Sequence, residues 1–362
     1  MPRIALVTAR AARDTDHDMS PLLVALRDAG AEAHEVDWDD DGIEWSRFDL
    51  ALLRSTWDYC ERLPAFLDWA ARVSAQTWLL NPLEVIRWNT DKHYLADLAR
   101  DGVPVVPSTF VEPSEDAAAA VDRFLRRFPH PTAAPLSDSH VVCSSRNPAV
   151  GFLPPAFGPT RTAPGSSQAR ALTPASGGRD NRDVVVKPAV GAGSRDAQRH
   201  AHGNRDAIVA HLQRLLDRGR SALLQPYLEH VDEHGETALL FFDGVFSHAI
   251  RKGPLLERNA GSTTGLYAKE TIEPRTPSTD ELDVAQRALA AIPFAQPLLY
   301  ARVDLIHDDD GSPRLLELEL VEPSVFLEHS CGAAKRFVAA ILRIAYLHPP
   351  APMARPPSFR RG

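Results

Sequence analysis

Three carboxylates near the end of the chain, Asp304, Glu317 and Glu319, have the composition of a divalent metal site. Each is flanked by apolar residues in a pattern that predicts two neighbouring strands. Like charges that face each other across two strands destabilise a sheet, so we expect a cation between them. Mg²⁺ binds carboxylate oxygens together with substrate phosphates and is the expected ion. The alternative is a solvated strand face with a cross-strand ion pair.

A hairpin is needed to bring these carboxylates together. Its strands are predicted over 300–306 and 315–320, joined by Asp310-Gly311, a dipeptide favoured in two-residue type I′ turns. This turn sets Arg302 opposite Glu319, places the other two carboxylates face to face, and puts all four side chains on one face. The other face is apolar and consists of Ala301, Val303, Leu305, Leu316, Leu318 and Leu320.

Composition excludes several classes of function. The 362 residues suffice for about two or three subdomains, and a hydrophobic content of 44% supports a buried core. A net charge of −8 and a pI near 6.0 are unlike those of nucleic-acid-binding proteins, which need a basic surface. No apolar run could span a membrane or serve as a signal peptide. Three cysteines without metal-binding spacing indicate a reducing, cytoplasmic environment.

Residues 1–85 predict a small open α/β domain. We expect strands over 4–8, 32–37 and 49–53 and a helix over 21–29. Ligands of open α/β sheets bind beyond the carboxyl ends of the strands. The side chains expected at this substrate edge are Arg54, Trp57, Asp58 and Tyr59. A surface loop with an aromatic anchor is the alternative.

Two larger lobes are predicted over 86–228 and 229–347. The first contains a segment of about 130–182, rich in Pro, Ala, Ser and Gly, that predicts a disordered insertion, and residues 348–362 are expected to form a flexible tail. Helices are expected from a cap at 89–92 to Arg100 and over 116–128, 206–219, 278–292 and 335–346. Further strands are expected over 103–110, 183–187, 222–228, 236–242 and 245–251, the last two joined by Asp243-Gly244.

A glycine-rich segment follows the strand that ends in Lys187. Gly191, Gly193 and Ser194 could let backbone N–H groups approach phosphate oxygens, beside the positive charge of the lysine. The sequence lacks the full P-loop pattern, and no helix follows directly. Taken alone, the segment is equally well explained as a tight turn.

The order of these parts resembles that of the ATP-grasp superfamily of ligases, in which two α+β lobes hold ATP. Lys92 begins a helix, Lys187 precedes the glycine segment, residues 225–228 form a hinge, Lys252 ends a hairpin, and the carboxylate hairpin follows. The resemblance covers residues 80–335 apart from the insertion. It implies an α/β fold with two ATP-grasp lobes behind a small N-terminal domain. ATP and Mg²⁺ are then expected in the site, with Mn²⁺ as a substitute.

The resemblance also implies a role for individual residues. ATP would be bound by Lys92, Lys187, Gly191, Gly193, Ser194, Gln225, Tyr227, Leu228 and Glu236, with Glu229 as the second choice for the ribose. The metal ligands would be Asp304, Glu317 and Glu319. The family has Asn at the position of Glu319, and the extra negative charge suits two metal ions. Lys252 would lie near the γ-phosphate, Arg302 would stabilise the tetrahedral intermediate, and Ser324 would lie beside the acceptor pocket.

Within the superfamily, the chain is similar to the O-ureido-serine cyclo-ligases of cycloserine biosynthesis and their glutathione-synthetase-like relatives. The strings that carry this similarity are RSTWDY at 54–59, NTDKHYL at 89–95, GET at 235–237, FSHA at 246–249 and LELELVEPS at 316–324. The similarity implies an ATP-dependent ligase that activates a carboxylate as an acyl phosphate and joins it to an amine or a similar nucleophile.

The expected substrate is a small amino-acid-like molecule, and the product is either linear or cyclic. Neither nucleic acid nor a membrane is an expected partner, and a homodimer is left open. Two other functions are compatible with the same residues. One is a phosphotransferase that stops after phosphoryl transfer, and the other is a nucleotide sensor without turnover.

Overall fold

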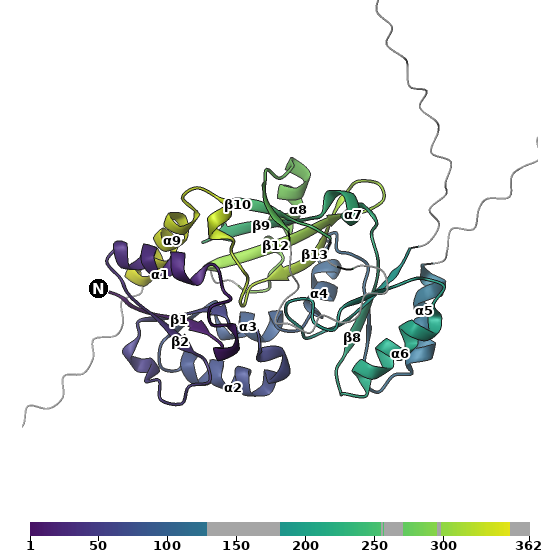
Figure 1. The fold of residues 1–362 in the computed structure, drawn as a ribbon, viewed down its shortest axis with the longest axis horizontal. Helices are drawn as coiled ribbons and strands as arrows, with labels where there is room; N and C mark the ends of the chain where they lie inside the picture. Colours follow the sequence, from purple (N-terminus) through teal and green to yellow (C-terminus); the bar gives the residue numbers. More distant parts are fainter. Residues whose placement is uncertain (129–181, 255, 257–270, 295–297, 348–362) are drawn as a thin grey trace, which may run out of the picture. The chain divides into compact units, whose positions relative to one another are not determined.

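The computed structural model describes residues 1–128, 182–254, 256, 271–294 and 298–347, and these residues form three β-sheets (Figure 1). The N-terminal sheet is parallel, in the order β2–β1–β3–β4. Its strands are β1 (Arg3–Thr8), β2 (Glu32–Asp37), β3 (Leu50–Ser55) and β4 (Trp78–Leu80). The mixed α/β fold expected from the sequence is confirmed.

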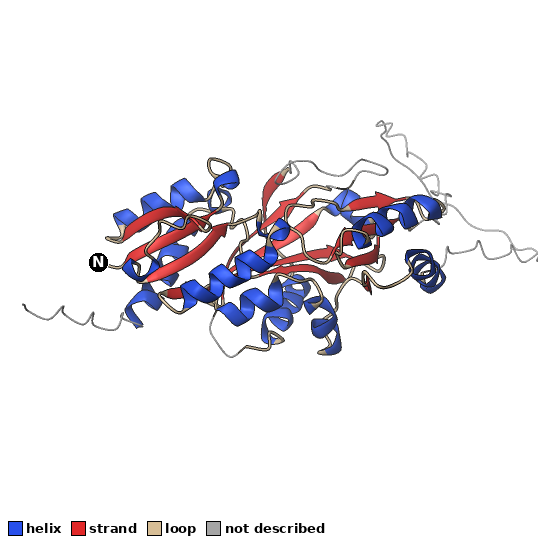
Figure 2. Cartoon of the chain, turned by 90° about the horizontal axis from the view of Figure 1, so that it is seen from below, coloured by secondary structure: helices blue, strands red, loops and turns tan. Residues whose placement is uncertain are grey.

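Helices cover both faces of this parallel sheet (Figure 2). Because side chains alternate along a strand, Leu6 packs toward α1 (Met19–Asp28) and α9 (Ala333–Leu347), while Val7 packs toward α2 (Leu63–Ser74). Burial on both faces explains why β1 is a continuous apolar run. The helix over Leu63–Ser74 was not predicted.

The other two sheets are antiparallel. The larger has the order β11–β10–β9–β12–β13, and the smaller has the order β5–β8–β6–β7. The strands are β5 (Thr109–Val111), β6 (Val184–Pro188), β7 (Gln198–His200), β8 (Ala222–Pro226), β9 (Glu236–Phe242), β10 (Val245–Lys252), β11 (Ile272–Arg275), β12 (Tyr300–His307) and β13 (Pro313–Glu319). The helices are α3 (Leu83–Asn89), α4 (Tyr94–Arg100), α5 (Ala117–Arg127), α6 (Arg205–Leu216), α7 (His230–His234) and α8 (Thr279–Ala290).

The predicted helix that ends at Arg100 is present as α4, which begins at Tyr94. Asn89 does not cap it, because Asn89 is the last residue of α3, a helix that was not predicted. The Asn89 side chain is instead used across the fold, donating to the Leu318 carbonyl and accepting from the Leu320 N–H, both at 2.8 Å. The Asn89 amide therefore connects the end of α3 to the end of β13.

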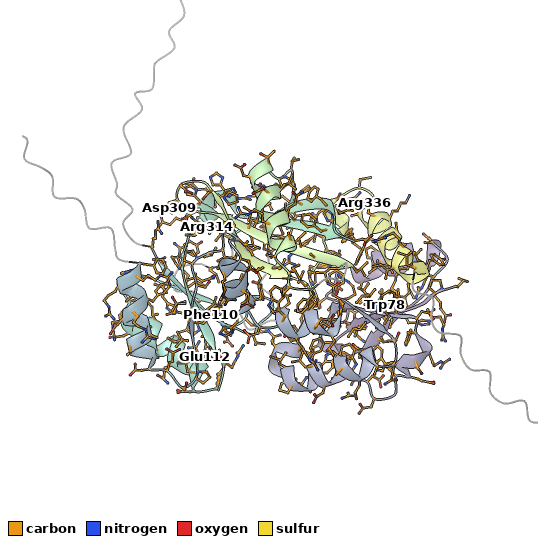
Figure 3. All side chains as sticks on the ribbon, turned by 180° about the vertical axis from the view of Figure 1, so that it is seen from behind. Trp78, Phe110, Glu112, Asp309, Arg314 and Arg336 are labelled. Carbon is orange, nitrogen blue, oxygen red and sulfur yellow. The ribbon has the colours of Figure 1, made fainter. Side chains whose placement is uncertain are left out.

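The turn of the carboxylate hairpin differs from the prediction. Gly311 has a φ of 79°, but Asp310 is not in the left-handed region that a type I′ turn requires at both positions. Gly311 N–H donates to the Asp308 carbonyl at 2.9 Å, and Asp308 N–H donates to Ser312. The connection is therefore one residue longer than predicted, at the tip where Asp309 lies (Figure 3). The turn at Asp243-Gly244 does have both φ values positive, at 53° and 75°.

A bulge restores the predicted pairing of charges. Near the turn Leu305 faces Leu315, one residue out of the predicted register, but beyond it Asp304 faces Glu317. Leu316 is the extra residue. It packs beside Ile306 on the same face as the carboxylates, whereas Leu315 enters the core on the opposite face. The prediction that Leu316 lies on the apolar core face is therefore wrong.

Most of the predicted insertion at 130–182 and the whole tail at 348–362 lie outside the described residues. Among the helices that the structure does describe, none has the length and apolarity needed to cross a membrane.

Candidate active site

Residues from the two antiparallel sheets and from loops of the N-terminal domain surround a cavity of about 970 Å³. The predicted nucleotide residues that line it are Lys92, Lys187, Gly191, Gly193, Ser194, Gln225, Tyr227, Leu228 and Glu236. The other predicted residues that line it are Lys252, Arg302, Asp304, Glu317, Glu319, Trp57, Tyr59 and Ser324. Three predicted residues do not line it: Arg54, Asp58 and Glu229.

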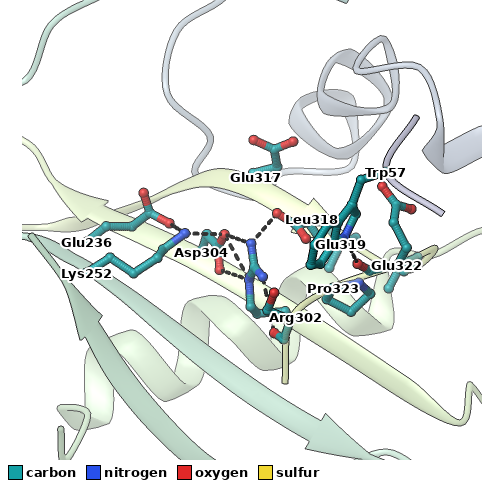
Figure 4. Close-up of polar contacts among 12 residues, drawn as sticks. Trp57, Glu236, Lys252, Arg302, Asp304, Glu317, Leu318, Glu319, Glu322 and Pro323 are labelled. Carbon is teal, nitrogen blue, oxygen red and sulfur yellow. Dashed lines mark hydrogen bonds and ion pairs between the residues drawn. The ribbon is translucent and has the colours of Figure 1, made fainter. Parts of the chain in front are cut away.

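Arg302 lies at the centre of the charged face of the cavity (Figure 4). Its Nε and Nη2 each donate to Asp304 at 2.9 Å, and Nη2 also pairs with Glu319. Lys252 Nζ donates to Asp304 Oδ2 at 2.9 Å and pairs with Glu236. Burial acts to raise the pKa of Asp304, but the charges of Arg302 and Lys252 outweigh it and hold that pKa below its ordinary range. Asp304 is therefore ionised.

The two lysines of the predicted phosphate site differ in their surroundings. Lys92 Nζ pairs with Glu317 at 2.7 Å and donates to the Gly191 carbonyl at 3.1 Å. Burial lowers the pKa of Lys187. Among the residues that the structure describes, no carboxylate forms an ion pair with its ammonium group. Lys187 thus offers the cavity a positive charge that a phosphate oxygen could neutralise.

The three predicted metal ligands lie on one face of β12 and β13. Within the described ranges, no three His, Cys, Asp or Glu side chains converge as a metal site would require. Each of these carboxylates is instead drawn to a lysine or arginine. Burial, aided by the charges of Asp304 and Glu317 and opposed by Arg302, raises the pKa of Glu319 to about 7. The three carboxylates place several oxygen atoms on one face, and the neighbouring charges of Asp304 and Glu317 help to raise the pKa of Glu319, so this donor set fits an added divalent cation.

One end of the cavity is an apolar pocket that was not predicted. Its walls are Val106, Leu228, Val231, Ile306 and Leu316. Such a pocket between a strand pair and a hinge suits a flat aromatic ring. The period of two along β12 could have revealed Ile306, which shares the face of Asp304. No pattern in the sequence reveals Leu316, because only the bulge turns it to this face.

Of the four residues predicted at the substrate edge, only Trp57 and Tyr59 line the cavity. Arg54 is fully buried, with Nη2 at 3.4 Å from Asp18 and Nη1 donating to the Pro323 carbonyl at 3.1 Å. Asp58 accepts from the Trp38 indole at 2.9 Å on the outside of this wall. Arg54 and Asp58 therefore hold the wall in place, and Trp57 and Tyr59 form its surface.

Trp57 joins two loops across the cavity. Its indole N–H donates to the Glu322 carbonyl at 3.1 Å (Figure 4), and its own carbonyl accepts from Arg195, also at 3.1 Å. Arg195 follows the glycine segment and also pairs with Glu61. The N-terminal domain therefore contacts both the glycine segment and the loop after β13.

Sequence reasoning missed several residues at this end of the cavity. They are Thr15, His17, Asp18, Arg195, Glu322, Phe326, Glu328 and His329. Burial, aided by the charge of Glu319, raises the pKa of Glu322 to about 8. Glu229 precedes α7 as its N-cap residue and does not line the cavity, which leaves Glu236 as the better-placed acid for a ribose.

Comparison with known proteins identifies relatives of this chain in sequence and in fold. A family model described as the N-terminal domain of D-cycloserine synthetase DcsG matches residues 4–81. The chain is 38% identical to the cycloserine biosynthesis protein DcsG of Streptomyces lavendulae over 342 residues, which is 93% of this chain and 97% of DcsG. The crystal structure of D-cycloserine synthetase DcsG matches with a TM-score of 0.75 over 94% of this chain and 99% of that one.

More distant structures share the fold alone. D-alanine–D-alanine ligase from Bacillus anthracis, in complex with ATP, has a TM-score of 0.55 at 14% identity, over 96% of this chain and 98% of the ligase. The ATP-grasp ligase PsnB, in complex with a minimal precursor, has a TM-score of 0.54 at 17% identity, over 94% of this chain and 98% of PsnB. The expected ATP-grasp fold is confirmed.

Proposed function

The chain belongs to the ATP-grasp ligases, in the family of DcsG, and from this premise we propose that it closes a small O-substituted serine into a cyclic amide. It is an ATP-dependent ligase that uses a divalent metal ion. The observation that carries the proposal is the extent of the match to DcsG, which includes both the ATP lobes and the N-terminal domain beside the acceptor end of the cavity.

We assign the ATP site to the cleft between residues 86–228 and 229–347, with residues 1–85 closing its acceptor end. Adenine would lie against Leu228, Ile306 and Leu316, an apolar pocket of suitable chemistry. The triphosphate would meet Lys92 and Lys187, the second of which is buried with a positive charge to neutralise. Gly191 and Gly193, in the segment after Lys187, allow close approach of backbone N–H groups.

Asp304, Glu317 and Glu319 would hold the metal ion, for which we propose Mg²⁺. PsnB, which shares the fold of this chain, has been observed with Mg and ADP. When bound, the ion neutralises phosphate charge and orients the γ-phosphate. In this arrangement Lys252, fixed between Glu236 and Asp304, is near the transferred group.

The reaction would proceed in two steps at the acceptor end. The substrate carboxylate attacks the γ-phosphorus, which gives an acyl phosphate and ADP. A nitrogen on the side chain of the same substrate then attacks the acyl carbon and displaces phosphate. The Arg302 guanidinium is the donor group available to stabilise the oxyanion of the intermediate. Walls formed by Trp57 and Tyr59 would limit the substrate to a small molecule and keep water out.

The experiment is an assay of the purified protein with O-ureido-D-serine, ATP and Mg²⁺, in which ADP and the cyclised product are both quantified. We expect equal amounts of each, and a loss of roughly 10³-fold or more in Glu317→Gln, because phosphoryl transfer depends on electrostatic stabilisation. Asp310→Asn, an exposed carboxylate in the turn of the same hairpin, is the matched control and should keep wild-type rates.

ADP without a cyclised product would reject ring closure. Full activity of Glu317→Gln would reject the assignment of the metal site. Replacing Mg²⁺ by Mn²⁺ adds a measurement that does not depend on turnover, because bound Mn²⁺ can be counted by electron paramagnetic resonance in the wild type and in Glu317→Gln.

A further inference from the structure

We propose that Asp18, in the N-terminal domain, is a positioning residue for Arg302 and acts through the loop at 323–327. The inference rests on the proposed function, in which Arg302 faces the reacting carbonyl. It adds a residue that lies outside both ATP lobes and far from Arg302 in the sequence.

The loop that follows β13 contacts the Arg302 side chain from the acceptor side. The Ser324 carbonyl accepts from Arg302 Nη1 at 3.2 Å. The Phe326 ring lies under the guanidinium, with its centroid 5.6 Å from Cζ. Asp304 and Glu319 hold the guanidinium from the strands. The orientation of Arg302 toward a substrate therefore depends on where the loop is held.

Asp18 supplies the main side-chain anchor of this loop. Its Oδ2 accepts from the N–H groups of Val325 at 2.7 Å and Phe326 at 3.0 Å, and its Oδ1 accepts from the N–H of Leu327 at 2.7 Å. The carboxylate is only 3% exposed. Three consecutive backbone donors on one buried carboxylate leave it little capacity for a substrate, so its contribution is to position the loop.

The loop needs such an anchor because its backbone is in a costly conformation. Phe326 has φ 50° and ψ 48°, the left-handed region that non-glycine residues rarely adopt. The hydrogen bonds to Asp18 favour this conformation, since it aims three N–H groups at one point. Without them, the loop would be free to leave the left-handed region and carry the Phe326 ring away from Arg302.

Arg54 completes the anchor from β3. Its Nη2 lies 3.4 Å from Asp18 Oδ2, and its Nη1 donates to the Pro323 carbonyl at 3.1 Å. One arginine thus holds both Asp18 and the start of the loop. This explains why a fully buried arginine lies near the end of an otherwise apolar strand of the N-terminal sheet.

Asp18→Asn tests the proposal. The substitution replaces one of the two acceptor oxygens by an NH₂ group, which cannot accept a hydrogen bond from the backbone N–H groups of the loop. Asp37→Asn is the matched control. Asp37 is 5% exposed, ends β2 of the N-terminal sheet and pairs with Arg13 at 2.8 Å. It does not line the cavity. With ATP, Mg²⁺ and O-ureido-D-serine, we expect kcat of Asp18→Asn to fall by roughly 10- to 100-fold. The KM for ATP should stay within about twofold, and ADP release per cyclised product should rise, since the second step is the one impaired.

Hydrogen–deuterium exchange of the 325–327 amides gives a readout that does not depend on catalysis. We expect exchange roughly tenfold faster in Asp18→Asn and unchanged in Asp37→Asn. If Asp18→Asn does not fold, Arg54→Met provides the same comparison. A wild-type protein that makes no product rejects the proposed function and leaves the exchange measurement valid. An active wild type, with kcat, coupling and exchange of Asp18→Asn equal to those of Asp37→Asn, overturns the inference.

Discussion

Glu322 is a buried acid that should weaken the protein as pH rises. Its side chain lines the acceptor end of the cavity at 9% exposure. Among the described residues, no lysine or arginine forms an ion pair with it. Burial, aided by Glu319, raises its pKa to about 8, from an ordinary value of 4.5. The perturbation to make is Glu322→Gln, which keeps the shape of the side chain and removes its ionisation.

The sign of the effect follows from proton linkage. Below pH 4.5 the carboxyl is protonated in both the folded and the unfolded chain, so it adds no dependence on pH. Between pH 4.5 and about 8, the unfolded chain is ionised while the folded one keeps its proton. The free energy of unfolding of the wild type then falls by about 1.4 kcal/mol per pH unit, up to about 5 kcal/mol over the window. Water that enters the cavity reduces this cost, and we expect about 2 kcal/mol.

The assay is urea unfolding of the ligand-free protein at pH 5, 6, 7, 8 and 9. The free energy of unfolding of Glu322→Gln, relative to the wild type, should rise by about 2 kcal/mol from pH 5 to pH 9. Glu328→Gln is the control, because Glu328 lines the same cavity but is exposed, and its difference from the wild type should stay flat. If the stability difference between Glu322→Gln and the wild type does not change with pH, or falls as the pH rises, then the pKa of Glu322 is not raised in the folded protein.

Two further predictions concern the ATP lobes. Leu316→Gln should raise the KM for ATP by roughly 10-fold, through loss of about 1.5 kcal/mol of apolar contact, and should leave kcat within about twofold. A decrease in kcat with an unchanged KM for ATP would contradict the assignment of Leu316 to the adenine pocket. Lys187→Met should raise the urea midpoint, because burial lowers the pKa of an ammonium group that pairs with no carboxylate of the described residues. The same variant should weaken ATP binding by roughly 10-fold or more, measured by calorimetry, and a lower urea midpoint would contradict this account.

The sequence carried enough information to pair the carboxylates but not to describe their turn. The period of two determines which residues share a face, and this held for Arg302 opposite Glu319. Asp310-Gly311 led to the wrong turn length, because glycine in the left-handed region suits both the two-residue turn and the longer turn that is present. The extra residue in the turn and the bulge at Leu316 offset each other, so the predicted pairing was right for an incomplete reason.

Contacts between distant residues were beyond the reach of local patterns. Asn89 has the residue type of a helix cap, yet its amide is used by main-chain groups more than 200 residues away. Arg54 lies near the carboxyl end of β3, where binding residues are often found, and no periodicity distinguishes a buried arginine from an exposed one there. Asp18 gave no signal at all, because its partners lie about 307 residues further along the chain.

The N-terminal domain is therefore part of the proposed active site rather than an attachment to it. Asp18 holds the loop beside Arg302, and Trp57 connects that loop with the segment that carries Arg195. Because these contacts are hydrogen bonds with strict geometry, we expect a small shift of the domain to change the proposed oxyanion site and the proposed phosphate site together. Both phosphoryl transfer and the proposed ring closure would then require the N-terminal domain to keep these contacts. We expect this requirement to protect an acyl phosphate intermediate from hydrolysis.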